Sequence, residues 1–164
     1  LAETKSTNSK TDGQKSIGAA IAGLAVIDET NFSPLISFFR YFLEAKQMSD
    51  DMEDLISDLA RGNITTTGER VLMVLANKRP QQPHYEIEHD KEMLLSIFWN
   101  DVYPALHDEL IVLLQKATMI IADLPIHVAN RDSNYFIDLI INLQQTLNRT
   151  HKERRIVQDF LKAY

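Results

Sequence analysis

The sequence predicts an all-α protein, a helical bundle of five to seven helices built on a long antiparallel pair of C-terminal helices. Two observations favour this fold class. Apolar residues recur at steps of three and four over long stretches, and this spacing places them on one face of an α-helix. Glycine and proline number only five each in 164 residues, too few for the frequent turns of a β-sandwich or β-barrel.

Composition narrows the function classes. The formal net charge of −6 disfavours nucleic-acid binding, because an acidic chain repels phosphates. The chain has no cysteine, which excludes disulfides and thiolate metal sites and is in keeping with a reducing compartment such as the cytoplasm. No apolar run reaches the ~18 residues of a membrane-spanning helix, so we expect a soluble protein. Because the first residue is Leu1, we expect a processed form or an excised domain.

The chain divides into a polar N-terminal tail, residues 1–14, and one helical domain, residues 15–164. Short helices are expected within 15–79 and long helices within 84–164. A linker over 80–83 separates them, because Pro80 and Pro83 cannot continue a helix. The short helices are predicted over 16–28, 34–47, 49–61 and 66–78.

Local signals set these boundaries. Ser33 followed by Pro34 is typical of a helix start. Ser49 precedes a run of carboxylates, which are favoured in the first turn of a helix. Gly62 suits a helix C-cap, and Thr66 with Glu69 matches a capping box.

The two long helices are predicted over 90–124 and 133–162, joined by a loop that includes 126–131. Pro104 lies inside the first, so we expect a kink there. In the second, apolar residues follow heptad-like steps, and Arg154 interrupts the stripe. The stripe of the first helix comprises Leu94, Phe98, Val102, Leu106, Leu110, Leu113, Ala117, Ile121 and Leu124.

Two clusters of opposite charge are the candidate partner-binding residues. We expect them to pair within the fold, between protomers or with a partner, because complementary charges steer association. The C-terminal helix also remains apolar to its end, so we expect either a continuation of the chain beyond Tyr164 or self-association. The candidate residues are Asp50, Asp51 and Asp54 in the acidic cluster, Arg149, Lys152, Arg154 and Arg155 in the basic cluster, and the apolar Val157, Leu161 and Tyr164.

The favoured function is therefore a non-catalytic interaction module, a regulatory, adaptor or assembly domain that binds another protein or itself. No nucleotide-binding, nucleophile-elbow or zinc-protease motif is present, and no cofactor is predicted. One alternative is a ligand- or metal-binding sensor bundle, with His84, Glu88 and His89 as the metal ligands. A second alternative is a membrane-active protein that uses the apolar segment 16–27.

Overall fold

The structure is a computed structural model that describes residues 29–81, 84–123 and 126–163, with side chains described for 33–81, 84–123 and 136–156. The described residues form helices and no strand, which confirms the predicted all-α class. The tail 1–14 and the predicted helix 16–28 lie outside them. In chain order the elements are α2 (Glu29–Glu53), α3 (Leu55–Ala60), α4 (Thr66–Lys78), α5 (Ile87–Ile97), the π-helix η1 (Phe98–Val102), α6 (Tyr103–Ala122) and α7 (Ile126–Ala163).

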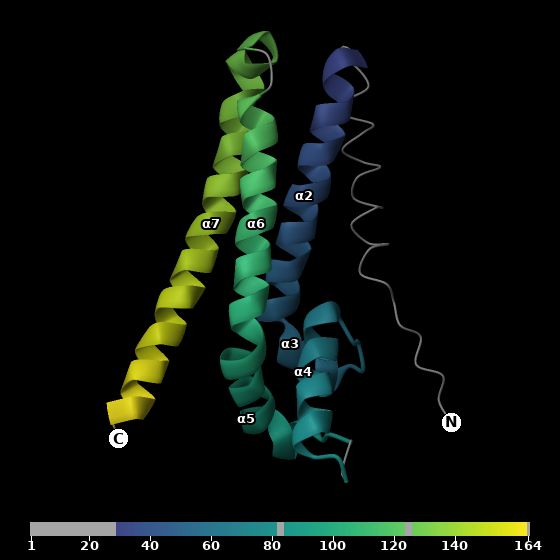
Figure 1. Cartoon of the computed structure of the whole chain (residues 1–164), viewed down its shortest axis with the longest axis vertical. Coiled ribbons are helices and arrows are strands. Elements are labelled where there is room, and N and C mark those ends of the chain that lie inside the picture. Colours follow the sequence, from purple (N-terminus) through teal and green to yellow (C-terminus); the bar gives the residue numbers. More distant parts are fainter. Residues whose placement is uncertain (1–28, 82–83, 124–125, 164) are drawn as a thin grey trace.

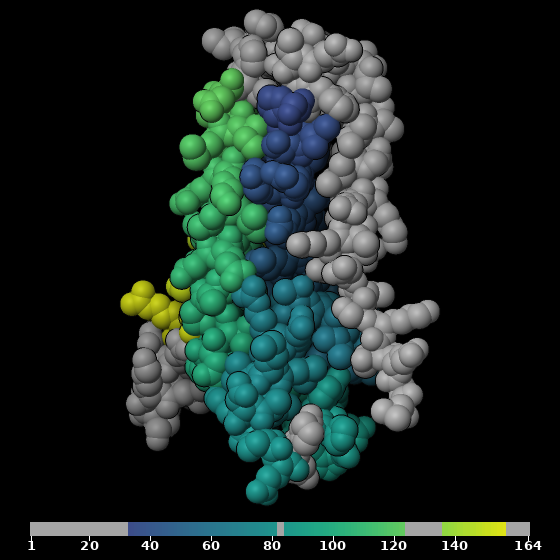
Figure 2. All heavy atoms as spheres, turned by 45° about the vertical axis from the view of Figure 1, so that its right-hand side comes forward, coloured from purple at the N-terminus to yellow at the C-terminus, as the bar shows by residue number. Residues whose placement is uncertain are grey.

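Three long helices, α2, α6 and α7, run along the long axis of the molecule, and the short helices α3, α4 and α5 gather at one end (Figure 1). The most extensive contact is between α2 and α6, and α6 also contacts α7. In the space-filling view the side chains of α2 and α6 meet along their length, above the short helices (Figure 2). The predicted stripe therefore faces α2 more than it faces the C-terminal helix.

The core of this contact is one apolar face on each helix. Phe38 of α2 stacks on Phe42, with ring centroids 5.8 Å apart, and meets the edge of Phe136 of α7 at 5.1 Å. Aromatic pairs of this kind add stability beyond the area they bury. The buried residues of the seam are Leu35, Phe38, Phe42, Ala45, Ser49 and Met52 on α2, and Tyr103, Leu106, Leu110, Leu114, Ala117 and Ile121 on α6.

The predicted helix boundary between Gln47 and Ser49 is wrong, because α2 continues without interruption to Glu53. Ser49 is buried and continues the steps of three and four from Phe42 through to Met52. Its position in the seam therefore outweighs its tendency to cap a helix. The start predicted at Pro34 is also wrong, since α2 begins at Glu29.

The boundaries of α4 are close to the prediction. Thr65, one residue before the expected cap, accepts a hydrogen bond through Oγ1 from the Gly68 backbone N–H at 3.2 Å. Gly68 therefore occupies the position where the predicted capping box requires Glu69. Gly62 has a φ of +72°, the left-handed conformation that glycine provides at a helix end.

Both ends of the proline-containing linker are tied together. Arg79, at the end of α4, donates to Asp90 Oδ1 at 2.7 Å, and Asp90 Oδ2 accepts from the Glu86 backbone N–H at 3.0 Å. These two bonds lower the pKa of Asp90 below its ordinary value. Because α4 also contacts α5 and η1, the linker joins packed elements.

A π-helix precedes Pro104, where the sequence predicts a kink. Pro104 has no N–H to donate one turn back, and the five residues of η1 widen the helix up to Val102, two residues before Pro104. Helical structure is thus continuous from Ile87 to Ala122. The wider turn places Phe98 and Trp99 beside the end of α2, where they line a cleft.

The loop predicted over 126–131 is wrong, because α7 begins at Ile126. The start predicted at 133 is wrong for the same reason, and Asp132 and Ser133, both residues that favour a helix N-cap, lie inside α7. Such residues cost at most about 0.7 kcal/mol each in a helix interior, which a helix of 38 residues tolerates.

Truncation of the seam tests the importance of the α2–α6 contact. Leu114 is fully buried, so Leu114→Ala should lower the free energy of unfolding by about 2–5 kcal/mol. Met73 is 61% exposed, so Met73→Ala should change it by less than about 0.5 kcal/mol. Urea unfolding followed by circular dichroism measures both, and equal losses would contradict the assigned seam.

Candidate functional site

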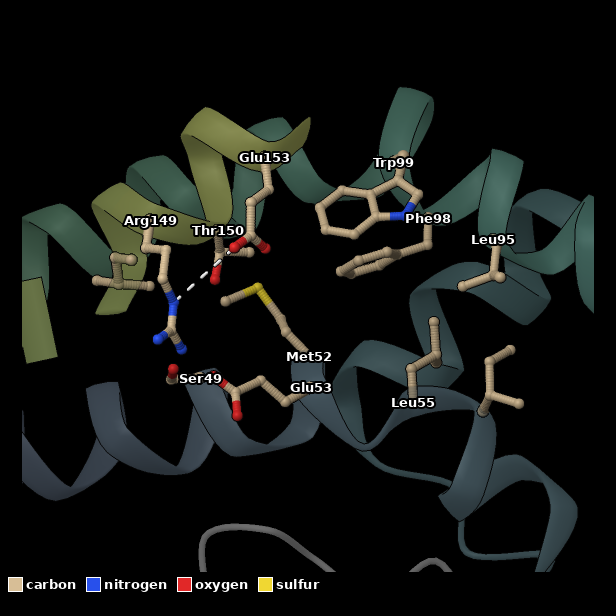
Figure 3. A pocket seen from close by; sticks show the side chains of 12 residues that line it. Ser49, Met52, Glu53, Leu55, Leu95, Phe98, Trp99, Arg149, Thr150 and Glu153 are labelled. Atoms are coloured by element: carbon tan, nitrogen blue, oxygen red, sulfur yellow. Dashed lines mark ion pairs between the residues drawn. The ribbon is translucent and has the colours of Figure 1, made fainter. Parts of the chain in front are cut away.

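A cleft of about 320 Å³ lies where the C-terminal end of α2 meets α3, α5, η1 and α7. Figure 3 shows its side chains converging from these elements. Segments far apart in the sequence therefore build a single site. The lining residues are Ser49, Met52, Glu53, Leu55, Ile56, Leu95, Phe98, Trp99, Leu147, Arg149, Thr150 and Glu153.

The floor of the cleft is apolar. Leu55, Phe98 and Leu147 are buried, and Trp99 is half-buried against Phe98, with ring centroids 4.7 Å apart. Met52 points into the same space between these aromatic rings and α7 (Figure 3). A half-buried aromatic ring such as Trp99, next to an adaptable methionine side chain, is typical of surfaces that receive another apolar group.

The rim of the cleft is charged and polar. Arg149 and Glu153 of α7 approach each other at 4.0 Å between Nε and Oε1, and the Arg149 side chain extends toward Ser49 of α2 (Figure 3). Glu53 adds a carboxylate from α2. The Arg149–Glu153 pair is exposed and contributes little stability, since exposed ion pairs contribute about 0–1 kcal/mol. Its charges remain accessible to a ligand.

The acidic cluster is bound mainly to its own helix. Both carboxylate oxygens of Asp50 accept from Lys46, at 2.9 and 3.0 Å, and Asp51 Oδ1 accepts from Gln47 at 2.7 Å. Burial is the main cause that raises the pKa of Asp51, and the neighbouring carboxylates Asp58, Asp50 and Asp54 raise it further. Of the three residues of the predicted acidic cluster, Asp51 is buried, Asp50 is half-buried, and Asp54 is exposed at the junction of α2 and α3.

The basic cluster divides into two kinds of residue. Arg149, Lys152 and Arg155 are exposed, whereas the Arg154 guanidinium lies 5.0 Å from the centroid of the Tyr103 ring. Such cation–π contacts stabilise the fold, so Arg154 belongs to the contact between α6 and α7. The side chains of Val157 and Leu161, and all of Tyr164, lie outside the described residues.

A column of rings joins η1 and α6 to α7 beside the cleft, and sequence reasoning missed it. Trp99, Tyr103 and His107 succeed one another at steps of four, with centroids 5.1 and 5.7 Å apart. His151 of α7 meets His107 at 4.8 Å and Tyr103 at 6.3 Å. The signal in the sequence is the Trp99-x₃-Tyr103-x₃-His107 spacing, but only the register of α7 identifies the partner.

Two polar atoms, one in this column and one beside it, are shielded from solvent. The Tyr103 hydroxyl and Arg154 Nε are buried, and among the described side chains neither has a hydrogen-bond partner. Burial raises the pKa of Tyr103, so its hydroxyl is neutral at physiological pH. The part of the α6–α7 contact around Tyr103 and Arg154 is therefore more polar than the α2–α6 seam.

The residues of the metal alternative do not converge. His84, Glu88 and His89 are all exposed, and His89 Nδ1 lies 3.2 Å from the Glu86 carboxylate instead. Within the described ranges no group of three or more histidine, cysteine, aspartate or glutamate side chains could hold a metal ion.

Comparison of the chain with protein families, with curated proteins and with solved structures gives no match. Across 29–81, 84–123 and 126–163, no helix is both long enough and apolar enough to cross a bilayer.

Replacement of Asp51 tests the effect of its burial. The folded state raises the pKa of this carboxyl, so ionisation opposes folding, and stability is lost as the pH rises through the unfolded value near 3.8. Asp51→Asn keeps an acceptor for Gln47 and should raise the urea midpoint at pH 7 but not at pH 3. Asp54→Asn, at an exposed position, is the control. Equal gains for the two variants at pH 7 would contradict this account.

Replacement of Arg154 tests the stacking on Tyr103. Arg154→Gln should lower the free energy of unfolding by about 0.5–2 kcal/mol, the usual range for a cation–π contact. Lys152→Gln removes an exposed cation from the same turn and should be nearly neutral. Urea unfolding at pH 7.5 measures the free energy of unfolding of both variants. Similar losses would show that removal of a positive charge, and not the contact with Tyr103, lowers the stability.

Proposed function

We propose that this chain is a helical protein-interaction module, a regulatory, adaptor or assembly domain whose cleft receives an apolar side chain from a partner. The supporting observation is the cleft itself, with buried Phe98 and Leu147 at its floor and Arg149 and Glu153 at its rim. Protein interfaces combine an apolar centre with a polar rim, and their strongest contacts are enriched in tryptophan and arginine.

The long helices provide the frame in this proposal. We take α6 and α7 as the antiparallel pair of the bundle, with α7 supplying one wall of the cleft and α2 the facing wall. Both walls carry charge, Glu53 on α2 and Arg149 on α7, so a partner meets both signs. Charge complementarity of this kind orients a partner and raises its association rate.

The partner is another protein or a second copy of this chain. The exposed Arg149 and Lys152 beside the cleft favour a segment with an apolar anchor residue next to acidic residues. Arg154 contributes indirectly in this scheme, because its guanidinium is engaged by Tyr103 and holds α7 in place.

A second candidate is a ligand-binding bundle that uses the same cleft. Its volume of about 320 Å³ falls at the lower end of the range for small-molecule sites, roughly 300–1,000 Å³. A compact aromatic molecule with a carboxylate suits Trp99 and Arg149. The metal-binding alternative gains no support from the described residues, and the segment 16–27 of the membrane-active alternative lies outside them.

Selection of helical peptides from a displayed library tests the interaction proposal. Peptides enriched on the wild-type chain are titrated against Thr150→Lys, which places a long cation at the half-buried rim. Because the cation blocks entry to the floor, the dissociation constant should rise at least about tenfold, equivalent to 1.4 kcal/mol. Light scattering of the chain alone measures its molar mass in solution, and the mass of a dimer would identify a second copy of this chain as the partner.

The matched control is Gln145→Lys, an exposed position on the same helix. It should leave the dissociation constant unchanged, and both variants are first compared with the wild type by circular dichroism and urea midpoint. Peptides that bind all three proteins equally would place the interaction elsewhere. A library that yields no binder, together with a monomeric mass, would overturn the proposal.

A further inference from the structure

We infer that His107 and His151 form a proton-sensitive clasp between α6 and α7, which holds the helices together while both imidazoles are neutral. The link from the clasp to the cleft rests on the proposed function, whereas the clasp itself rests on the ring contacts alone.

The geometry brings the two imidazoles together across the helix contact. Their centroids are 4.8 Å apart and their planes are inclined by 33°. Both rings also lie against Tyr103, which is fully buried. The side chain of His107 is only 19% exposed, whereas His151 is exposed on the α7 side of the contact. Two imidazolium ions at this separation repel each other, and a half-buried one also loses hydration.

The surrounding charges oppose protonation of His151. On α7, Arg154 lies over the Tyr103 ring, and Arg155 acts on His151 through its charge. On α6, Tyr103 is neutral, and the Asp108 carboxylate lies 3.7 Å from His107 Nδ1 but is 87% exposed, so solvent screens its attraction. The clasp is therefore closed at neutral pH and weakened when protons bind.

The direction of the effect follows from His151. Although His151 is exposed, partial desolvation where its ring meets His107 and Tyr103 is the main cause that lowers its pKa, and the charges of His107, Arg154 and Arg155 lower it further. The unfolded chain then binds more protons than the folded chain in the window below 6.5, the ordinary value for histidine. Stability from the neutral ring is complete above that value. It is lost as the pH falls from 6.5 toward the folded pKa.

Release of the clasp also affects the cleft. His151 follows Thr150 and precedes Glu153 on the same turn of α7, and both neighbours line the cleft. Movement of this turn away from α6 separates the α7 wall from Trp99. Acidification should therefore weaken partner binding through the same two histidines.

The test compares the full-length chain with His107→Phe/His151→Phe, which keeps two stacked rings and removes their charge. Urea midpoints are measured at pH 7.5 and 5.5. The wild-type midpoint should fall on acidification, and the double variant should lose less than half as much. The control is His84→Gln/His89→Gln, which removes two exposed histidines and should follow the wild type. A double variant that retains the full loss overturns the clasp.

Histidine titration and amide exchange test the clasp in the wild-type chain itself. If the double variant does not fold, the titration of His151 in the wild-type chain by nuclear magnetic resonance replaces it, and His151 must titrate below the ordinary histidine value of about 6.5. Amide exchange protection factors at both pH values should fall in residues 143–156 and persist in residues 103–122. Unchanged protection in 143–156 contradicts the clasp. Loss of protection in a chain that binds no peptide at pH 7.5 supports the clasp and refutes only the proposed function.

Discussion

The apolar seam between α2 and α6 is the contact on which the other elements depend. It buries residues from Leu35 to Met52 on one helix and from Tyr103 to Ile121 on the other. Burial of a leucine-sized side chain contributes about 1.5–3 kcal/mol, so a face of this length can outweigh local signals such as the serine at position 49. The seam also fixes the end of α2, where the cleft begins.

Pro104 affects the site through the backbone. Its missing N–H is accommodated by η1, and the wider turn carries Phe98 and Trp99 to the floor of the cleft. π-Helical turns recur at functional sites because they displace side chains from the regular helical register. The same turn starts the column of rings that continues through Tyr103 to His107, so the cleft and the α6–α7 contact share one structural origin.

The packing of α7 changes character along its length. At one end Phe136 packs on Phe38 and Phe39 of α2, and at the other end His151 and Arg154 meet Tyr103 and His107 of α6. Polar groups in a helix contact reduce its stability but make it responsive to charge. The interaction proposal and the clasp both concern this polar end of α7.

The sequence by itself determined the helical class, the boundaries of α4 and the apolar face of α6, because periodicity and turn chemistry are local properties. Tertiary structure decided where α2 ends, because burial of Ser49 in the seam outweighs its capping preference. Tertiary structure also decided which side chains meet. His107 and His151 are far apart in the sequence, as are Glu53 and Arg149, yet the first two rings are in contact and the second two residues line one cleft. Such pairings depend on the register between helices, which arises from packing and leaves no local pattern. The cleft was therefore not predictable, although the sequence marked Arg149 and the acidic end of α2 as candidate contacts.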